Sequence, residues 1–440
     1  MKAILLDGSD ANDSRAHRVD MVLTTELESH GWQVEHVLLR EKKIGNCAGD
    51  FFCWTRNPGI CNVDDDNRKI AESIINSDLM VYLTPITFGG YSSVLKKMID
   101  HQLPNISPLF AQVNGETHHQ RRYRNYPNLL AIGWMEQHEL QAEMIFRHLV
   151  HRNAINFYAK KSVAGLVIAN QTDDEIQLSV QNWMKNLNQR SSTKLETSLP
   201  IAEASPQLSP IRSALLLVGS PRTKKSTSYS LGSYLFEQLS AHNILTKTIH
   251  IHTSIRSPKR MKTLLEAVDA ADLVLLAFPL YVDSLPAPAI EALERIAVHR
   301  ASNAETSPYQ THRQLFAAIS NCGFPEAQQN ETALAICANF AKQAGLHWAG
   351  SLALGAGEGM IHGIPLNELD GRVLPLKKAL DLAASALAHG RTIPQEVQDL
   401  LAKPFIPVWL YRWMGIYGWK QQAKRYGMAN SLKRQPYEVK

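Results

Sequence analysis

The sequence predicts an α/β protein made of two tandem, doubly wound five-stranded parallel sheets. The first observation is a repeated pattern, in which an apolar run ends in Gly-Ser and a later apolar run ends in a proline-aromatic loop. The pattern reads AILLDGS and DLMVYLTPITFGG at Ala3–Ser9 and Asp78–Gly90, then ALLLVGS and DLVLLAFPLYVDS at Ala214–Ser220 and Asp272–Ser284. The second observation is that continuous apolar runs alternate with helical patterns, as strands buried on both faces of a parallel sheet require. Together they indicate a duplicated domain.

The apolar runs place five strands in each half, with helical segments between them. In the first half we expect strands near Lys2–Asp7, Gln33–Leu39, Asp78–Thr84, Asn128–Gly133 and Ser162–Ile168. In the second half we expect them near Ser213–Val218, Lys247–His252, Asp272–Phe278, Gln314–Ser320 and His347–Leu354. Five strands alternating with helices are the content of one doubly wound domain.

Length and composition fit this division into domains. A chain of 440 residues with 45% hydrophobic residues can build a separate core in each half. A polar stretch with several serines and prolines between the halves reads as a linker. We therefore expect a first domain at 1–185, a linker at 186–210, a second domain at 211–391 and an aromatic and basic tail at 392–440.

The length of the apolar runs, the cysteine content and the net charge argue against several classes of protein. No apolar run approaches the about 18 residues that cross a bilayer, and the start of the chain does not read as a signal peptide. Five cysteines in so long a chain form no disulfide framework, so we expect reduced thiols and a cytoplasmic protein. The formal charge of +5 is mild and gives no case for nucleic acid.

The loop after the first strand of the second half predicts an anion site. Ligands of open parallel sheets bind beyond the carboxyl ends of the strands. Here the loop reads GSPRTKKSTSYSL at Gly219–Leu231, with a hydroxyl cluster and basic residues at a helix start. Backbone N–H groups at such a start attract phosphate. The candidate residues are Ser220, Arg222, Ser226, Thr227 and Ser228. The alternative is an ordinary capped helix after a turn.

The loops after the third and fourth strands of the second half should border the same site. The third-strand loop, FPLYVDSLPAP at Phe278–Pro288, offers Tyr281 as the wall for a planar heterocycle. The fourth-strand loop, SNCGFPEAQQN at Ser320–Asn330, should close the opposite rim through Cys322 and Gly323.

These segments resemble the NADPH-dependent FMN reductase and iron-sulfur flavoprotein branch of the flavodoxin-like superfamily. GSPR with the following Ser/Thr cluster is similar to the family's FMN-phosphate loop, and the third-strand loop to the one beside the isoalloxazine ring. The resemblance implies two flavodoxin-like domains, non-covalent FMN and NAD(P)H as electron donor. It implies that the ring is contacted by Pro279, Leu280, Tyr281, Val282 and Asp283.

The first half resembles the same family with a strong ring loop and a weak phosphate loop. TPITFGGYSSVLKKMIDH at Thr84–His101 is similar to the family's proline-aromatic-glycine loop and its following helix. The phosphate loop departs, because Asp10 and Asp13 stand where phosphate would sit, and carboxylates repel a dianion unless they point away. The resemblance implies cofactor contacts from Ser9, Ser14, Pro85, Ile86, Thr87, Phe88 and Gly89.

Three cysteines lie in an insertion before the third strand of the first half. The segment at Ile44–Asp66 holds Cys47, Cys53 and Cys61. Iron-sulfur members of the family use four cysteines, so the resemblance implies that a chain with an incomplete set lacks a cluster. Three thiolates with a fourth ligand from elsewhere remain the alternative. We expect no metal here and instead a buried loop or a subunit contact.

A second insertion, at Phe110–Pro127, is rich in histidine, arginine and tyrosine and is too polar for a core. We interpret it as a lid that binds the phosphates of NADPH or an acidic substrate. The residues expected to do so are His118, His119, Arg121 and Arg122. The alternative is a solvated loop that contacts another domain or subunit.

Two further features need an interpretation. GAGEG at Gly355–Gly359 departs from the dinucleotide spacing GxGxxG, so it reads as a glycine-rich strand exit near the flavin or a domain contact. The tail interleaves Trp and Tyr with Arg and Lys around Trp409–Arg425. It should either pack on the flavin domain or a second subunit, which we favour because proline and glycine interrupt it, or touch a membrane as an interfacial helix.

The combined prediction is a tandem flavoprotein that works as an NAD(P)H-dependent oxidoreductase. Flavin would pass electrons to a quinone, flavin, azo or similar small acceptor, and no side chain is expected to act as catalytic acid or base. We expect a homodimer. Two alternatives from other classes are an electron-transfer protein without its own NAD(P)H site and a non-catalytic scaffold with decayed flavin pockets.

Overall fold

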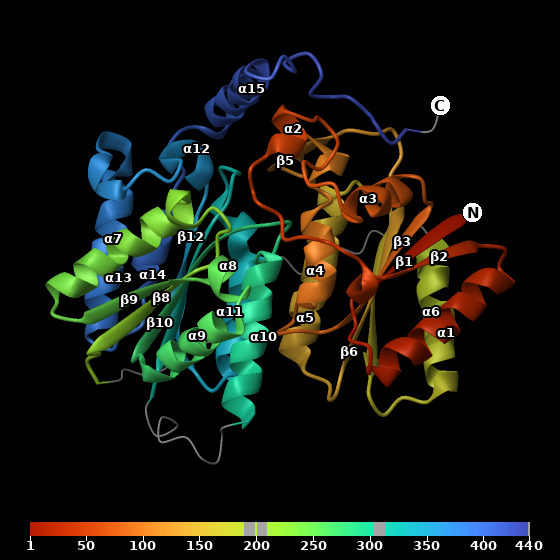
Figure 1. Cartoon of the computed structure of the whole chain (residues 1–440), viewed down its shortest axis with the longest axis horizontal. Coiled ribbons are helices and arrows are strands. Elements are labelled where there is room, and N and C mark those ends of the chain that lie inside the picture. The colour runs from red at the N-terminus through yellow and green to blue at the C-terminus, as the bar shows by residue number, and fades with distance from the viewer. Residues whose placement is uncertain (189–198, 200–208, 303–312, 439–440) are drawn as a thin grey trace. The chain divides into compact units, whose positions relative to one another are not determined.

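The chain divides into two compact units, each containing one of the two sheets. The computed structural model describes residues 1–188, 199, 209–302 and 313–438. The first unit comprises Met1–Leu199 and Arg412–Lys440, and the second comprises Pro200–Tyr411. Of the predicted linker at 186–210, residues 189–198 and 200–208 lie outside the described residues. The four predicted domain ranges remain predictions. Figure 1 shows the order of the elements along the chain.

The sheet of the first unit is parallel throughout, as the continuous apolar runs predict. Its strand order is β2-β1-β3-β6-β7, which places the first strand of the chain between the second and the third. This is the doubly wound order of flavodoxin-like domains. The strands are β1 (Lys2–Asp7), β2 (Gln33–Leu38), β3 (Leu79–Pro85), β6 (Asn128–Met135) and β7 (Ser162–Ile168).

Helices cover both faces of the first sheet (Figure 1). On one face α1 and α6 pack against each other, and on the other lie α4 and α5. In α1 the buried residues Ala16, Val19, Leu23 and Leu27 recur at the three- and four-residue spacing of one helix face. The helices are α1 (Ser14–Ser29), α2 (Phe52–Thr55), α3 (Asn67–Ile75), α4 (Ser93–Asp100), α5 (Leu140–Asn156) and α6 (Asp173–Asn188).

The second unit repeats this architecture. Its parallel sheet has the order β12-β11-β10-β8-β9, which is the same topology read from the other edge. The strands are β8 (Ser213–Val218), β9 (Leu245–His250), β10 (Leu273–Pro279), β11 (Leu315–Asn321) and β12 (His347–Leu354). All ten predicted strands are therefore present, with ends that shift by up to two residues. The prediction of two tandem flavodoxin-like sheets is confirmed.

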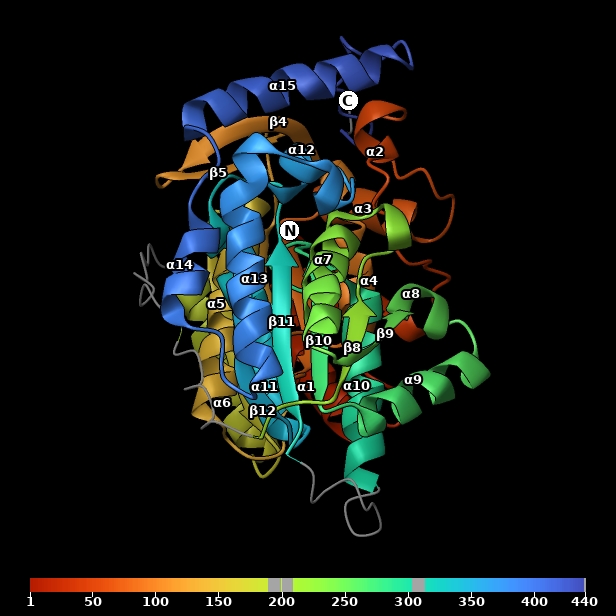
Figure 2. The same cartoon turned by 90° about the vertical axis from the view of Figure 1, so that its left-hand side faces the viewer.

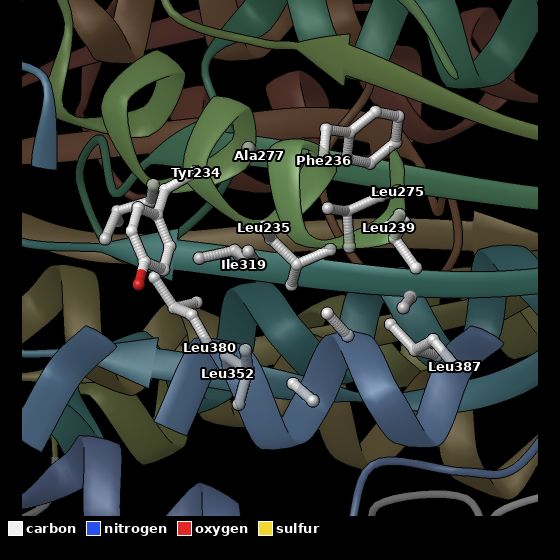
Figure 3. Packing of buried hydrophobic residues seen from close by; sticks show 14 of the residues in the cluster. Tyr234, Leu235, Phe236, Leu239, Leu275, Ala277, Ile319, Leu352, Leu380 and Leu387 are labelled. Atoms are coloured by element: carbon white, nitrogen blue, oxygen red, sulfur yellow. The ribbon is translucent and has the colours of Figure 1, made fainter. Parts of the chain in front are cut away.

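The core of the second unit fills the space between its sheet and two long helices. Figure 2 shows α7 and α13 in front of the sheet. Figure 3 shows Leu235 and Leu239 of α7 facing Leu380 and Leu387 of α13, with Ile319 of the sheet among them. The helices are α7 (Thr227–Ala241), α8 (Ile251–Ser254), α9 (Pro258–Ala270), α10 (Ala287–Ser302), α11 (Glu331–Gln343), α12 (Gly357–Ile361), α13 (Leu374–Ala388), α14 (Gln395–Ala402) and α15 (Val408–Lys424).

An antiparallel hairpin in the first unit was not predicted. Strands β4 (Ile106–Val113) and β5 (Glu116–Arg121) pair across a two-residue turn at Asn114-Gly115, where both residues have positive φ. Asn-Gly is the usual sequence of this turn, so the signal was present. The polar sequence of β5, ETHHQR, masks the strand that follows this turn.

The tail after Arg412 folds onto the first unit through one side of α15 and the extended segment that follows. Trp419 of α15 meets Phe51 and Trp54 edge-on, with ring centroids 5.3 and 5.2 Å apart. A Cβ atom added at Gly415 would lie 2.4 Å from the ring of Phe110, so the helix backbone runs against the hairpin. The expectation that glycine interrupts a helix here is wrong, because α15 continues through Gly415 and Gly418, and packing on the flavin domain or a second subunit stays a prediction. In the part of the chain that the structure describes, no helix has the length and apolar character to cross a membrane.

Candidate functional site

The loop between β8 and α7 begins the candidate site in the second unit. Ser226 is the N-cap of α7: its hydroxyl accepts a hydrogen bond from the backbone N–H of Tyr229 at 3.1 Å and donates to the carbonyl of Thr223 at 2.6 Å. The hydroxyl of Ser220 accepts from the N–H of Arg222 at 3.3 Å. Part of the predicted hydroxyl cluster therefore shapes the loop itself.

A carboxylate of the chain occupies the basic end of this loop. Arg222 donates to both oxygens of Glu358, with 2.8 Å from Nη1 to Oε1, and Thr227 Oγ1 lies 3.4 Å from Oε2. Burial acts to lower the pKa of Arg222, but the hydrogen bonds and charge of Glu358 outweigh it and raise that pKa. The carboxylate has the charge and bidentate geometry with which a phosphate would meet an arginine. The start of α7 thus forms an anion site whose present anion is Glu358.

Glu358 reaches this position because the glycine-rich segment after β12 packs directly on the phosphate loop. At Gly363, whose φ is +72°, an added Cβ atom would lie 2.4 Å from the carbonyl oxygen of Lys225. At Gly355 it would lie 2.3 Å from the carbonyl oxygen of Pro325. Only glycine allows so close an approach of two backbones. The GAGEG segment therefore places the carboxylate of Glu358 in the anion site. The spacing of its glycines did not indicate that role.

The loop after β10 is a tight turn beside the anion site. Tyr281 and Ser284 exchange both backbone hydrogen bonds, at 2.9 and 3.1 Å, and enclose Val282 and Asp283. Both enclosed residues have positive φ, at 45° and 59°, as the mirror-image turn type requires. Pro279, Leu280, Tyr281 and Val282 are half-buried, whereas Asp283 is buried. Because β10 pairs directly with β8, this turn and the phosphate loop leave the same edge of the sheet side by side.

Val282 occupies a backbone conformation that a β-branched residue rarely adopts, and such strain is held in place only by the surrounding structure. We expect Val282→Gly to raise the free energy of unfolding by about 1 kcal/mol, because glycine removes the steric cost of positive φ. Chemical denaturation of the second unit measures this change. Val298→Gly is the matched control, since Val298 is an exposed residue within α10 and its loss should lower stability. If both variants were less stable than the unchanged protein, the prediction that the backbone at Val282 is strained would be contradicted.

Asn321, the last residue of β11, forms hydrogen bonds with residues that follow β8 and β10. Its carbonyl accepts from the N–H of Leu280 at 2.8 Å, and its side-chain oxygen accepts from the hydroxyl of Ser228 at 2.8 Å. The sequence reasoning missed Asn321, because a buried asparagine at a strand end gives no periodic signal. Cys322 next to it is buried, and burial raises the pKa of its thiol to about 12. Gly323 accepts a hydrogen bond from the hydroxyl of Tyr411 at 2.8 Å.

In the first unit, Asp7 and Asp13 accept hydrogen bonds that the predicted phosphate loop could donate to a phosphate. Asp13 is the N-cap of α1, where its carboxylate accepts from the N–H groups of Arg15 and Ala16 and from Trp134 Nε1 at 2.8 Å. Asp7 accepts from the N–H of Ser9 at 2.8 Å and pairs with Arg40 at 2.7 Å, and that guanidinium also lies 3.3 Å from the Ser9 hydroxyl. Asp13 therefore points into the helix start, the arrangement that disfavours a phosphate dianion, while Ser14 stays exposed.

The ring loop of the first unit repeats the turn of the second. Thr87 and Gly90 exchange backbone hydrogen bonds at 3.0 and 2.7 Å around Phe88 and Gly89, both with positive φ. A Cβ atom added at Gly89 would lie 2.8 Å from Ile145 Cβ, so glycine is required there for close packing as well as for the turn. Pro85, Ile86 and Thr87 are half-buried and Phe88 is buried. The cofactor contacts predicted for this loop remain predictions.

The three cysteines of the first insertion line a cavity of about 30 Å³, which we call the thiol cavity. Cys61 Sγ lies 3.5 Å from Nδ1 of His101, whose Nε2 contacts the carbonyl of Gly45 at 2.8 Å. Asp50 and Asp100 also line it. Among the described residues, no three or more His, Cys, Asp or Glu side chains are arranged to hold a metal ion. The arrangement does not fit a cluster, and the prediction that these thiols hold no metal is left to experiment.

The thiols of the cavity should react slowly. Burial, with a contribution from the charge of Asp100, raises the pKa of Cys47 to about 12, and burial also raises the pKa of Cys53 and Cys61. Because the thiolate is the reactive form, we expect Cys47 to be alkylated at pH 8 about a thousandfold more slowly in the native protein than in the unfolded chain. Mass spectrometry after timed iodoacetamide labelling, with and without guanidinium, measures both rates. Similar rates in the two conditions would contradict the prediction.

The second insertion does not form an exposed lid, and the expectation that it is too polar for the interior is wrong. His118 and Arg122 are 1% and 2% exposed. Arg122 donates to the carbonyls of Pro104, Ile106, Leu432 and Arg434, so a buried guanidinium joins the hairpin to the tail. The ring of His119 lies 4.5 Å from that of Trp54 at a tilt of 53°, and burial lowers the pKa of His119 to about 3. Arg121 alone of the four is exposed. The substrate-binding roles of all four remain predictions.

The fold and the loop geometry define a class, the doubly wound α/β proteins that hold ligands at the carboxyl edge of a parallel sheet. The family model described as NADPH-dependent FMN reductase matches residues 1–144 and 213–340, which are more than half of the chain and include both phosphate loops and both ring loops. The chain belongs to this family, and the match in two segments agrees with a tandem duplication.

Comparison with individual proteins gives more distant matches. An iron-sulfur flavoprotein of Archaeoglobus fulgidus is 30% identical over 104 residues, 24% of this chain and 46% of its own length. An FMN-dependent NADPH-azoreductase of Staphylococcus aureus is 28% identical over 101 residues, 23% of this chain and 52% of its own length. An NAD(P)H:quinone oxidoreductase from Methanothermobacter marburgensis matches in structure with a TM-score of 0.30 and 11% identity, over 41% of this chain and 96% of its own. The chain spans about half the length of the curated relatives it matches.

Proposed function

We propose that this protein is an FMN-dependent NAD(P)H oxidoreductase that holds one FMN per chain, in the second unit. The observation that supports it most is the anion site of Arg222 and Thr227 beside the turn at Tyr281–Ser284. A chain that already places a carboxylate on an arginine at a helix start has the donors that a flavin phosphate needs. The name of the azoreductase relative agrees with this class of activity.

Two loops of the second unit would hold the cofactor, one at its phosphate and one at its ring. Arg222, Thr227 and the N–H groups at the start of α7 would bind the phosphate once Glu358 moves aside. The turn after β10 would lie beside the ring, with Tyr281 as its wall. Bound FMN would supply the hydride and electron chemistry, so the chain need only bind and orient it and its partners. A quinone, flavin or azo compound is the proposed acceptor, and a homodimer the proposed assembly.

The first unit favours a different role. Its phosphate loop holds Asp13 as a helix cap and Asp7 as a partner of Arg40, so an incoming phosphate would meet fixed carboxylates rather than a displaceable one. We propose that this unit binds no FMN and supports the thiol cavity, the hairpin and the tail instead. The non-catalytic alternative thus applies to one half of the chain.

The visible spectrum and the FMN content of the purified protein, followed by anaerobic addition of NADPH, test the proposal. We expect about one FMN per chain after incubation with FMN, and loss of its absorbance on addition of NADPH. Flavin that NADPH does not reduce would indicate an electron-transfer protein. If the protein stays colourless after incubation with FMN, it binds no flavin, and only the non-catalytic scaffold alternative remains. Two FMN per chain would contradict the assignment to the second unit alone.

A further inference from the structure

Helix α15 has two aromatic faces, and only one of them is covered. The inner face packs on the first unit through Gly415, Trp419 and Ala423, which recur every four residues, and Ala423 is fully buried. The outer face carries Trp413, Tyr417, Lys420 and Lys424, which share the opposite side of the helix. Trp413 and Tyr417 are 64% and 56% exposed, and their rings stack with centroids 6.2 Å apart. Trp409, one turn earlier, is 70% exposed.

The inner contacts fix which side of the helix faces outward. Trp419 contacts the stacked rings of Phe51 and Trp54 edge-on, and the ring of Phe110 presses on the backbone at Gly415. A rotation of α15 that buried Trp413 would have to withdraw Trp419 from these rings and would leave its large apolar surface in water. The exposure of Trp413 and Tyr417 is thus built into the packing of the first unit.

The charge around the outer face identifies its partner. Helix α15 contains no aspartate or glutamate, while Lys420 and Lys424 lie on its outer face and Arg425 follows directly. Trp and Tyr combine an apolar ring with a polar edge, which suits the headgroup region of a bilayer, and neighbouring lysines pair with anionic lipids. Protein–protein interfaces are also rich in aromatic rings but are depleted in lysine, so the two lysines beside these rings favour an anionic lipid surface.

We propose that the outer face of α15 is a membrane-binding surface that takes an anionic phospholipid bilayer. Trp413 and Tyr417 would sit at headgroup depth, and Lys420 and Lys424 would pair with the lipid phosphates. The helix would lie in the plane of the interface, since it does not span the bilayer. A membrane-bound reductase would have its acceptors concentrated nearby, but the surface itself depends only on α15 and not on the proposed function.

Flotation of the full chain with lipid vesicles tests this surface. Vesicles of phosphatidylcholine with about one third phosphatidylglycerol are expected to carry the protein upward at low salt, and pure phosphatidylcholine vesicles to carry little. Lys420→Gln/Lys424→Gln should weaken binding about 30-fold, because each lysine contributes about fivefold near an anionic surface. Trp413→Ala/Tyr417→Ala should weaken it at least about tenfold.

Two matched controls keep the result specific. Lys259→Gln/Lys262→Gln removes the same charge from exposed positions of α9, and Leu245→Ala removes another exposed apolar side chain. Both should bind vesicles like the unchanged protein. Equal binding of the α15 variants and the controls, or no binding to anionic vesicles at low salt, would overturn the proposal. So would a dimer, seen by sedimentation velocity, that Trp413→Ala/Tyr417→Ala dissociates, because a second copy would then cover the face.

Discussion

Replacing Lys96 by methionine is expected to lower the free energy of unfolding of the first unit by about 3–5 kcal/mol. Lys96 lies on α4, and its side chain is fully buried, in an ion pair with Asp100 one turn later. Methionine preserves the volume but removes the charge, so the Asp100 carboxylate would be left in the interior without its ammonium partner. A buried charge that loses its partner costs far more than the intact pair contributes. The effect should therefore exceed that of ordinary surface substitutions, which stay within about 0.5 kcal/mol.

Calorimetry of the full chain can measure this change, since the two units have separate cores. We expect the transition of the first unit to move to lower temperature and that of the second to stay. Lys97→Met is the control, because it makes the same change one residue along α4 at a half-buried position. Lys96→Met/Asp100→Leu should restore most of the lost stability by also removing the buried negative charge whose ammonium partner is gone. The prediction fails if Lys96→Met and Lys97→Met shift the first transition equally.

Replacing Glu358 by glutamine is expected to tighten the binding of FMN by about tenfold. In the protein as it stands, the phosphate must displace a carboxylate that accepts from both Arg222 and Thr227. Glutamine keeps the size of the side chain but removes the negative charge, so the guanidinium is more weakly held and phosphate meets no like charge. Arg222→Ala should have the opposite effect, weakening FMN about tenfold or more, because it removes the bidentate cation.

Quenching of flavin fluorescence on titration with protein gives the dissociation constants. Riboflavin, which lacks the phosphate, should bind equally to the unchanged protein and to Glu358→Gln, so a change confined to FMN locates the effect at the phosphate. Glu368→Gln, an exposed acid nearby in the chain, is the matched control and should change neither affinity. If FMN binds equally well with and without the Glu358 charge, that carboxylate does not compete for the phosphate position. If FMN binds to none of these proteins, the proposed function fails as well.

Each of the two phosphate loops is occupied by a carboxylate of the chain, but the carboxylate comes from a different place in each unit. In the first unit Asp13 belongs to the loop itself and caps α1, so displacing it would also cost the helix its cap, about 1 kcal/mol. In the second unit Glu358 comes from a different segment, and Ser226 caps α7 independently. Displacing Glu358 therefore leaves the helix start intact. This difference is the reason that we assign the cofactor to the second unit.

The sequence by itself determined the two sheets and the edge of each sheet at which its motif-bearing loops lie. Continuous apolar runs such as those of β1 and β8 must be covered on both faces, which only a parallel sheet between helix layers provides. The resulting topology brings the loops after β8, β10 and β11 to one edge. The Gly-Ser and proline-aromatic motifs lie in such loops, and the two ranges that the family model matches include them; that these loops hold a ligand stays a prediction.

Only the tertiary structure decided which groups those loops meet. Glu358 lies 136 positions from Arg222, and Trp419 lies more than 360 from Trp54, so no local periodicity connects either pair. Arg122 reads as a solvated lid residue in the sequence, yet four backbone carbonyls brought together by the hairpin and the tail satisfy its guanidinium in the interior. Local patterns report whether a residue suits a strand, a helix or water. The partner that makes a buried charge stable, or fills an anion site, comes from chain packing that such patterns do not encode.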